Sequence, residues 1–225
     1  MSASGWSEPA EEEERRRQRT PWGVMALVLL TGLALIRNGS GDFDAGPPQP
    51  ASAAAPDTRT GTGTGAPAAH APSLAFSGAD RVRIPSIRVD APVMPVGLDA
   101  DGWIGAPPSE DAGLAGWFTG AVSPGEKGTS VIVGHVDNRR GPAVFYGLGT
   151  LRKGNRIDVL RKDGRTAVFE VYGTEVFSKA HFPGDRVYGS KGTAELRLIT
   201  CGGGFSKQHG YDGNLVVFAR LVAVD

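Results

Sequence analysis

The stretch AELRLITCGGG, residues 194–204, joins a run of alternating side chains to three glycines. Because successive side chains of a strand point to opposite faces, Leu196, Leu198 and Thr200 are predicted to share one face. Cys201 then falls on the other face. The leucine face is typical of a core, so the sequence predicts that Cys201 points away from the core and into a groove.

Five other segments have the same β-branched or alternating character and are bounded by Gly, Pro, Asn or Asp. They are RVRIPSIRV (81–89), TSVIVGHV (129–136), RIDVLR (156–161), TAVFEVYGTEVF (166–177) and NLVVFARLVAV (214–224). No stretch has a convincing apolar period of 3.6 residues, which disfavours a parallel α/β architecture. Several short strands with glycine-rich turns predict an all-β fold, either a closed barrel or a sandwich.

The chain begins with a polar, arginine-rich tail over 1–20, followed by the uncharged apolar stretch PWGVMALVLLTGLALI (21–36). This length is close to the roughly 20 residues that span a bilayer. The basic flank predicts a cytoplasmic tail and an extracellular domain on a single-pass membrane protein. Because Arg37 follows without a small-x-small site, we expect a retained signal-anchor helix over 21–37. Cleavage near ASAAA (51–55) is the alternative, and a buried core helix is a weaker one.

Residues 38–72 are almost wholly Gly, Ala, Pro, Ser and Thr. Such a segment lacks the apolar side chains for a core, so it is predicted to be a disordered linker with a reach of roughly 30 Å. Composition becomes globular over 73–225, and about 150 residues can bury roughly two thirds of their surface as one domain. The 24 basic and 24 acidic residues balance, and no basic stripe is interleaved with aromatic residues, which disfavours nucleic acid as a partner.

Cys201 is the only cysteine in the sequence. Exported proteins normally pair their cysteines, so a count of one leaves an inert buried residue, an intermolecular bridge or a reactive nucleophile. Taken alone, a single cysteine on a strand is more often a small core residue. The three glycines that follow leave open backbone around the sulfur, which suits the close approach of another chain and favours the nucleophile.

An efficient thiol nucleophile needs a cationic or basic neighbour, and the sequence has four histidines. His70 falls in the linker, and His181 and His209 fall in loops where surface positions are expected. His135 ends an apolar strand, as Cys201 ends another, so His135 is the candidate partner. A hydrogen-bonded structural role is the alternative for His135. One cysteine and four scattered histidines show no metal-ligand spacing, and we expect no metal.

These motifs resemble the sortases, membrane-anchored cysteine transpeptidases of Gram-positive bacteria. GHVD (134–137) precedes a strand-borne LITC (198–201), and a last strand follows. The segments RVRIPSIRVDAPVMPVG, GWFTGAVSPGEKGTSVIVGHVD, GPAVFYGLGTLRKGNRI and LRLITCGGGF are most similar to class F, the actinobacterial group. The resemblance covers about residues 78–225.

The resemblance implies a closed eight-stranded β-barrel in which Cys201 attacks a backbone carbonyl of a C-terminal sorting signal of the LPXTG type, forming an acyl-thioester. His135 would protonate the leaving amine and then act as the base for an incoming amine, such as that of a peptidoglycan precursor. Surface proteins would thereby be attached to the cell wall. Thr200 matches the threonine before the family's cysteine and is expected to help shape the substrate groove. No cofactor is implied.

The sequence departs from the family near the start of its final strand. Sortases use an arginine there to bind substrate and stabilise the oxyanion, and YDGN (211–214) contains none. Pairing the last two strands as a hairpin places Cys201 near Asn214. Arg220 then lies about 20 Å away and Arg197 about 13 Å away, so both are expected to support structure. The remaining candidates for an oxyanion or substrate contact are backbone N–H groups and the side chains of Asn214, Arg139 and Arg140.

Other classes of protein share part of this pattern. An L,D-transpeptidase is also an exported Cys/His β enzyme acting on the cell wall, but its SHGC-type motif is absent here. A papain-like peptidase is disfavoured because its cysteine precedes the histidine and opens a helix. A non-catalytic, membrane-anchored binding module whose cysteine only packs is the alternative from a different class.

Overall fold

The computed structural model describes residues 46–50 and 71–225. The predicted cytoplasmic tail (1–20) and signal-anchor helix (21–37) lie outside the described residues, as does most of the predicted linker (38–72). Within the described part of the chain, no helix is both long and apolar enough to cross a bilayer.

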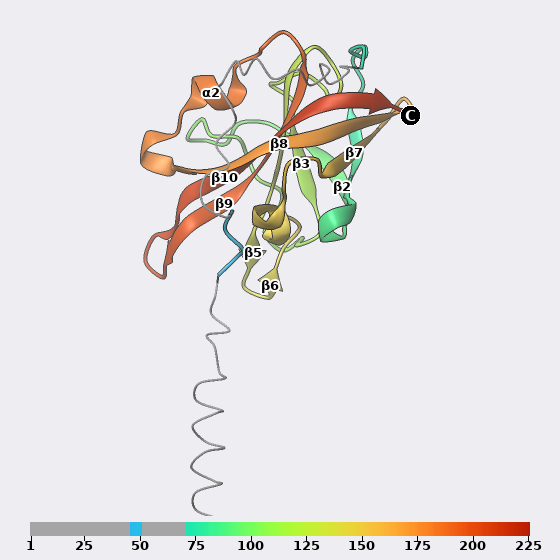
Figure 1. Ribbon diagram of the computed structural model, residues 1–225. Helices are drawn as coiled ribbons and strands as arrows, with labels where there is room; N and C mark the ends of the chain where they lie inside the picture. Colours follow the sequence, from blue (N-terminus) through green and yellow to red (C-terminus); the bar gives the residue numbers. More distant parts are fainter. Residues whose placement is uncertain (1–45, 51–70) are drawn as a thin grey trace, which may run out of the picture. The chain divides into compact units, whose positions relative to one another are not determined.

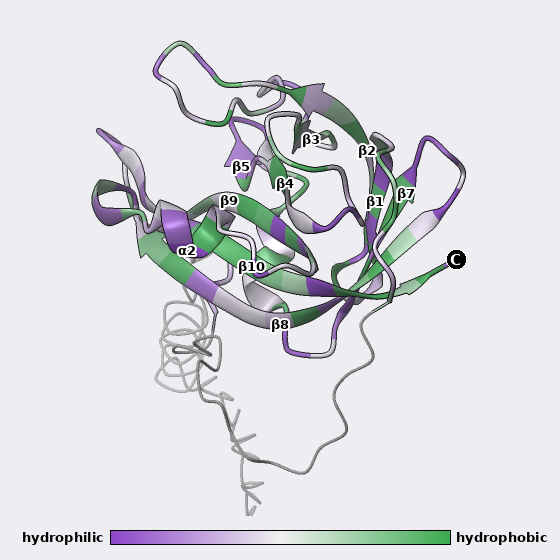
Figure 2. Ribbon diagram, turned by 90° about the horizontal axis from the view of Figure 1, so that it is seen from above, coloured by the Kyte–Doolittle hydropathy of each residue, from purple (hydrophilic) through white to green (hydrophobic). Residues whose placement is uncertain are grey.

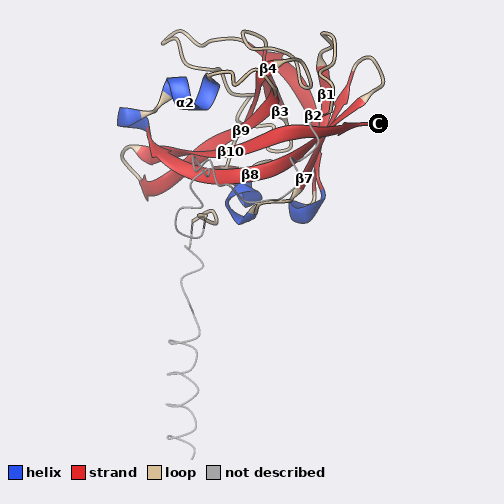
Figure 3. Cartoon of the chain, turned by 45° about the horizontal axis from the view of Figure 1, so that its top comes forward, coloured by secondary structure: helices blue, strands red, loops and turns tan. Residues whose placement is uncertain are grey.

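Eight strands close into a barrel in the order β1-β2-β3-β4-β9-β10-β8-β7 (Figure 1). Strands dominate the described chain, and the helical pieces are short (Figure 3). This confirms the expected all-β fold and selects the barrel over the sandwich. The barrel strands are β1 (Ala79–Ile84), β2 (Val89–Val96), β3 (Ala115–Phe118), β4 (Gly128–Gly134), β7 (Arg156–Arg161), β8 (Thr166–Ser178), β9 (Ala194–Ser206) and β10 (Gly210–Val224).

The remaining elements lie in the connections between barrel strands. A small hairpin of β5 (Asp137–Asn138) and β6 (Gly141–Pro142) follows β4. Over residues 71–225 there are also three 3-10 turns, η1 (Pro85–Ile87), η2 (Tyr146–Thr150) and η3 (Lys179–His181), and the short helix α2 (Gly184–Tyr188).

One predicted strand is wrong as a single element. RVRIPSIRV forms β1, the turn η1 and the start of β2, which returns antiparallel to β1. Pro85 has no N–H to donate to a ladder and begins the turn. Arg88 closes the turn in the left-handed region, with φ of 54°. The sequence therefore marked the right segment but missed a reversal of direction inside it.

The pairing of β9 with its two neighbours positions the residues of interest. β9 runs parallel to β4, with Val133 opposite Ile199 as the last pair of that register. β9 is also antiparallel to β10, with Cys201 opposite Asn214. The predicted hairpin between the last two strands is confirmed.

Apolar side chains cover both faces of this part of the sheet. Leu196, Leu198 and Leu215 belong to the core inside the barrel. A second cluster on the outer face includes Val133 and Ile199, and it is covered by residues of the β8–β9 connection. Figure 2 shows hydrophobic residues along β4 and β10. The second cluster, here called the outer cluster, forms the floor from which Cys201 projects.

Candidate active site

Cys201 lies within β9 on the outer face of the barrel, not at the strand end that the sequence predicted, and His135 directly follows the last residue of β4. Val133 and Ile199 are paired and both belong to the outer cluster. Cys201 follows Ile199 by two residues within β9 and so lies on the same face, and His135 follows Val133 by two residues, one residue past the end of β4. Neighbouring strands are about 4.8 Å apart. The sequence-predicted pair is therefore brought together from segments far apart in the chain. Cys201 is a free thiol, and both residues are partly exposed.

The His135 side chain is held by the connection between β2 and β3. Its Nε2 lies 2.7 Å from the carbonyl oxygen of Pro107. Since a carbonyl can only accept, Nε2 carries a proton, and in the neutral ring Nδ1 is the acceptor nitrogen. The backbone of His135 is fixed as well, because its carbonyl accepts a hydrogen bond from Phe145 N–H at 3.0 Å. These contacts leave Nδ1 as the ring nitrogen that can exchange a proton with another group.

Thr200 is buried on the barrel side of β9, with 4% of its surface exposed. Its Oγ1 donates a hydrogen bond to the carbonyl oxygen of Gly134 at 2.8 Å. The side chain therefore points away from the face that carries Cys201. Any influence of Thr200 on the groove is indirect, through the backbone that leads into His135.

Asn214 shares the face of Cys201, because opposite residues of an antiparallel pair project to the same side with Cβ atoms about 5 Å apart. It is partly exposed. The structure thus brings a side-chain amide beside the sulfur. Arg139 and Arg140 are exposed at the turn between β5 and β6.

The other two arginines that sequence reasoning considered are engaged elsewhere. Arg197 is fully buried, with Nη2 2.5 Å from Glu195 Oε2 and Nε donating to the carbonyl oxygen of Val187 at 2.9 Å. Arg220 pairs with Glu170 at 2.9 Å. Both guanidinium groups support structure, as expected.

Tyr211 and Asp137 were missed by sequence reasoning, although both stand within the quoted motifs. The Tyr211 hydroxyl donates a hydrogen bond to Asp137 Oδ2 at 2.5 Å. Burial, the hydrogen bond to Asp137 and the charges of Asp137 and Cys201 raise the pKa of Tyr211 well above its ordinary value. The phenol therefore stays protonated near the sulfur. Tyr211 stands in the stretch where sortases have their arginine, and this position was the signal by which sequence reasoning could have found it.

A short segment of the predicted linker also reaches this region. Gly46–Pro50 lies against the barrel, and the Gly203 N–H donates to Gln49 Oε1 at 3.3 Å. The carbonyl oxygen of Pro48 lies against Gly149 of η2, where any Cβ would collide with it. Gly46–Pro50 therefore contacts β9 two residues after Cys201.

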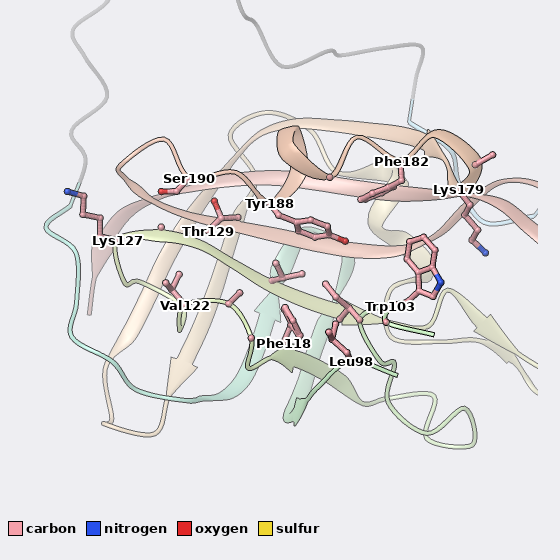
Figure 4. A pocket seen from close by; sticks show the side chains of 18 residues that line it. Leu98, Trp103, Phe118, Val122, Lys127, Thr129, Lys179, Phe182, Tyr188 and Ser190 are labelled. Carbon is pink, nitrogen blue, oxygen red and sulfur yellow. The ribbon is translucent and has the colours of Figure 1, made fainter. Parts of the chain in front are cut away.

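A groove of about 800 Å³ runs over the outer face (Figure 4). Its walls come from the β2–β3, β3–β4 and β8–β9 connections, with Trp103, Phe182 and Tyr188 among the lining side chains. Lys127 and Lys179 lie at opposite ends. Val131 of β4 also lines it, four residues or about 13 Å before His135. The groove lies over the outer cluster, and neither Cys201 nor His135 lines it.

The family comparison agrees with this geometry. Residues 82–222 match the model of the sortase domain, and the chain belongs to the sortase family. Members of this family are cysteine transpeptidases. No group of three or more potential metal ligands gathers among residues 46–50 and 71–225.

Solved structures with the same fold include three with sortase names. The SrtA sortase from Actinomyces oris has 21% identity and a TM-score of 0.50, covering 70% of this chain and 88% of that one. A lid mutant of sortase A from Corynebacterium diphtheriae has 20% identity and a TM-score of 0.52, with coverage of 68% and 74%. Sortase C-1 from Actinomyces oris has 25% identity and a TM-score of 0.50, with coverage of 64% and 73%. No curated protein sequence matches. The assignment to class F stays a prediction.

Proposed function

We propose that this chain is a class F sortase, anchored in the cell membrane with its barrel outside, that cleaves an LPXTG-like sorting signal and joins the product to an amine. The observation that carries the proposal is the pairing of β4 with β9 up to Val133 and Ile199, which places Cys201 of β9 beside His135, the residue after β4. The single cysteine leaves one candidate nucleophile.

The chemistry follows from these two side chains. The Cys201 sulfur attacks the scissile carbonyl carbon and forms a C–S bond, and the carbonyl electrons move onto oxygen. Collapse of this intermediate expels the amine, which takes a proton from His135 and leaves an acyl-thioester. An incoming amine then attacks the thioester and gives its proton to His135. The thiolate leaves, so the enzyme returns to its starting state.

The developing oxyanion needs a donor other than the family's arginine. The Asn214 amide lies on the same face as the sulfur, directly across the β9–β10 pair. An amide N–H can donate to an oxyanion, and backbone N–H groups near Gly202 can do the same. We assign Asn214 to this role. Arg139 and Arg140 remain candidates for contacts to the substrate, since their exposed position gives their long side chains freedom to reach it.

The N-terminal part of the proposal rests on sequence. The basic tail and apolar stretch predict a membrane anchor, which would keep the barrel near the outer membrane surface where exported proteins and peptidoglycan precursors meet. Sorting-signal peptides and a wall-precursor amine are therefore the proposed partners.

A thioester-trapping experiment on the full-length chain tests the activity. An LPXTG peptide and hydroxylamine should give the peptide hydroxamate, detected by mass spectrometry, and Cys201→Ala should give none. Undiminished turnover by Cys201→Ala would end the proposal.

A thiol-reactive probe separates the enzyme from a non-catalytic module. It should label Cys201 faster than a free-thiol standard and lose that preference in His135→Ala. His209→Ala is the matched control, because His209 is exposed in the β9–β10 turn. Equal labelling of all three proteins would favour the binding module.

A further inference from the structure

The backbone pairing of β4 and β9 stops short of the two reactive residues. Val133 opposite Ile199 is the last pair of the register, and β4 ends at Gly134. His135 and Cys201 both lie beyond this point. No backbone pair of β4 with β9 therefore joins the two segments at the reactive residues themselves.

Two side-chain hydrogen bonds connect the segment around His135 to the β9–β10 hairpin, one to each strand. On the barrel side, Thr200 Oγ1 donates to the carbonyl oxygen of Gly134, the residue before His135. On the other side, the Tyr211 hydroxyl donates to Asp137, two residues after His135. The reactive pair is thus flanked by one contact before the histidine and one after it.

Both partners of the second contact are held in place. Tyr211 is 9% exposed, and its ring centroid lies 5.0 Å from that of Phe205 across the hairpin. Asp137 pairs with Pro142 in the β5–β6 hairpin. The next residue, Asn138, donates from Nδ2 to the carbonyl oxygen of Ser109 at 2.8 Å. A hydrogen bond between two such restrained groups fixes the distance between the segments that carry them.

The protonation state of Tyr211 suits this role. The raised pKa of the phenol, caused first by burial and then by the hydrogen bond to Asp137, keeps the hydroxyl a donor across the working range of a Cys/His enzyme. The charge of Cys201 contributes to the same shift.

We infer that Tyr211 is a positioning residue, whose hydrogen bond to Asp137 holds the His135 segment against the hairpin that carries Cys201 and so sets the separation of imidazole and sulfur. The inference rests on the proposed function for its consequence in catalysis. Tyr211 does not react itself. It acts through Asp137, while Thr200 and Gly134 fix the opposite side.

The test uses Tyr211→Phe in the full-length chain and reads two quantities. The rate of Cys201 alkylation against pH reports how well the imidazole stabilises the thiolate, and it requires no substrate. Tyr211→Phe should raise the apparent thiol pKa and slow alkylation at neutral pH. With an LPXTG peptide, kcat should fall about ten- to a hundredfold, because small displacements of reacting groups have effects of that size. KM should change much less.

Tyr172→Phe is the matched control for a structural effect. Tyr172 also donates its hydroxyl to a carboxylate, Glu195 Oε2 at 2.9 Å, but the acceptor belongs to the buried Arg197 network. This variant should lower thermal stability without moving the alkylation profile. Asp137→Asn supplies the conservative test, since its amide oxygen can still accept from Tyr211, and it should retain more activity than Asp137→Ala.

The outcomes separate the inference from the proposed function. If Tyr211→Phe shows the wild-type alkylation profile, the inference is overturned, whatever the wild-type protein does to peptides. It is also overturned if Tyr211→Phe and Tyr172→Phe change the profile equally. The wild-type chain could also fail to cleave any sorting-signal peptide while Tyr211→Phe still shifts the alkylation profile. That result would refute the proposed function and support the positioning role.

Discussion

Replacing Thr200 by valine isolates one hydrogen bond at almost constant side-chain volume. Thr200 is 4% exposed, and its Oγ1 donates to the carbonyl oxygen of Gly134 at 2.8 Å. Removing the donor costs about 1–3 kcal/mol of unfolding free energy when the acceptor stays buried. For a domain of this size, each kcal/mol shifts Tm by roughly 2–4 °C. Thr200→Val should therefore lower Tm by roughly 2–12 °C, measured by thermal denaturation.

Thr200→Ser distinguishes stability from positioning. Serine keeps the hydroxyl and loses one buried methyl group, which costs about 0.8 kcal/mol. Both variants should therefore be less stable than the wild type. Turnover of a sorting-signal peptide should fall about tenfold or more only in Thr200→Val, because only that variant releases the backbone before His135.

Two results would refute the reasoning about Thr200. A valine variant with wild-type Tm would show that the hydroxyl contributes nothing to the fold. Equal turnover by the serine and valine variants, corrected for the folded fraction, would show that the contact with Gly134 does not position the histidine.

Three further changes follow from contacts described above. Arg197→Met leaves the buried Glu195 carboxylate without its cation and should cost about 3–5 kcal/mol in urea denaturation, most of it recovered when Glu195→Leu is added. Asn214→Ala removes the proposed oxyanion donor and should lower kcat about a hundred- to a thousandfold in steady-state kinetics. Gly149→Ala introduces a Cβ against the carbonyl oxygen of Pro48, so it should displace the segment and speed hydrogen exchange of the Gly203 amide.

Each of these three has an outcome that contradicts it. A double variant of Arg197 and Glu195 no more stable than the single one would mean that the charges are not coupled. Unchanged kcat in Asn214→Ala would leave the oxyanion to backbone donors. For Gly149→Ala the control is Gly113→Ala, an exposed glycine with open space around it, and equal exchange rates in both would place the segment elsewhere in solution.

The face of Cys201 could be predicted because strand alternation is a local property. The run AELRLIT specified which side chains enter the barrel, and the short turn after it specified the antiparallel partner, Asn214. Both follow from backbone geometry alone. The all-β class could be predicted for the same reason, since period and turn residues are visible in a single sequence.

The other features of the fold and of the candidate site depend on tertiary packing, which no local sequence pattern encodes. The reversal at Pro85 was missed because the alternating character continues on both sides of the turn. The contact of Tyr211 with Asp137 joins a hairpin to a segment far away in sequence, and no local pattern shows that these two residues meet. The contact of Gln49 with Gly203 comes from a stretch whose composition predicted only a linker.

The parallel pairing of β4 with β9 ties the chemistry to the completion of folding. Its partners, such as Val133 and Ile199, lie far apart in the sequence, and contacts of such high sequence separation form slowly. Until β4 and β9 pair, the thiol of Cys201 has no imidazole beside it and keeps the low reactivity of an ordinary cysteine. The chain therefore carries an unreactive sulfur while it folds and acquires its proposed nucleophile only with the finished barrel.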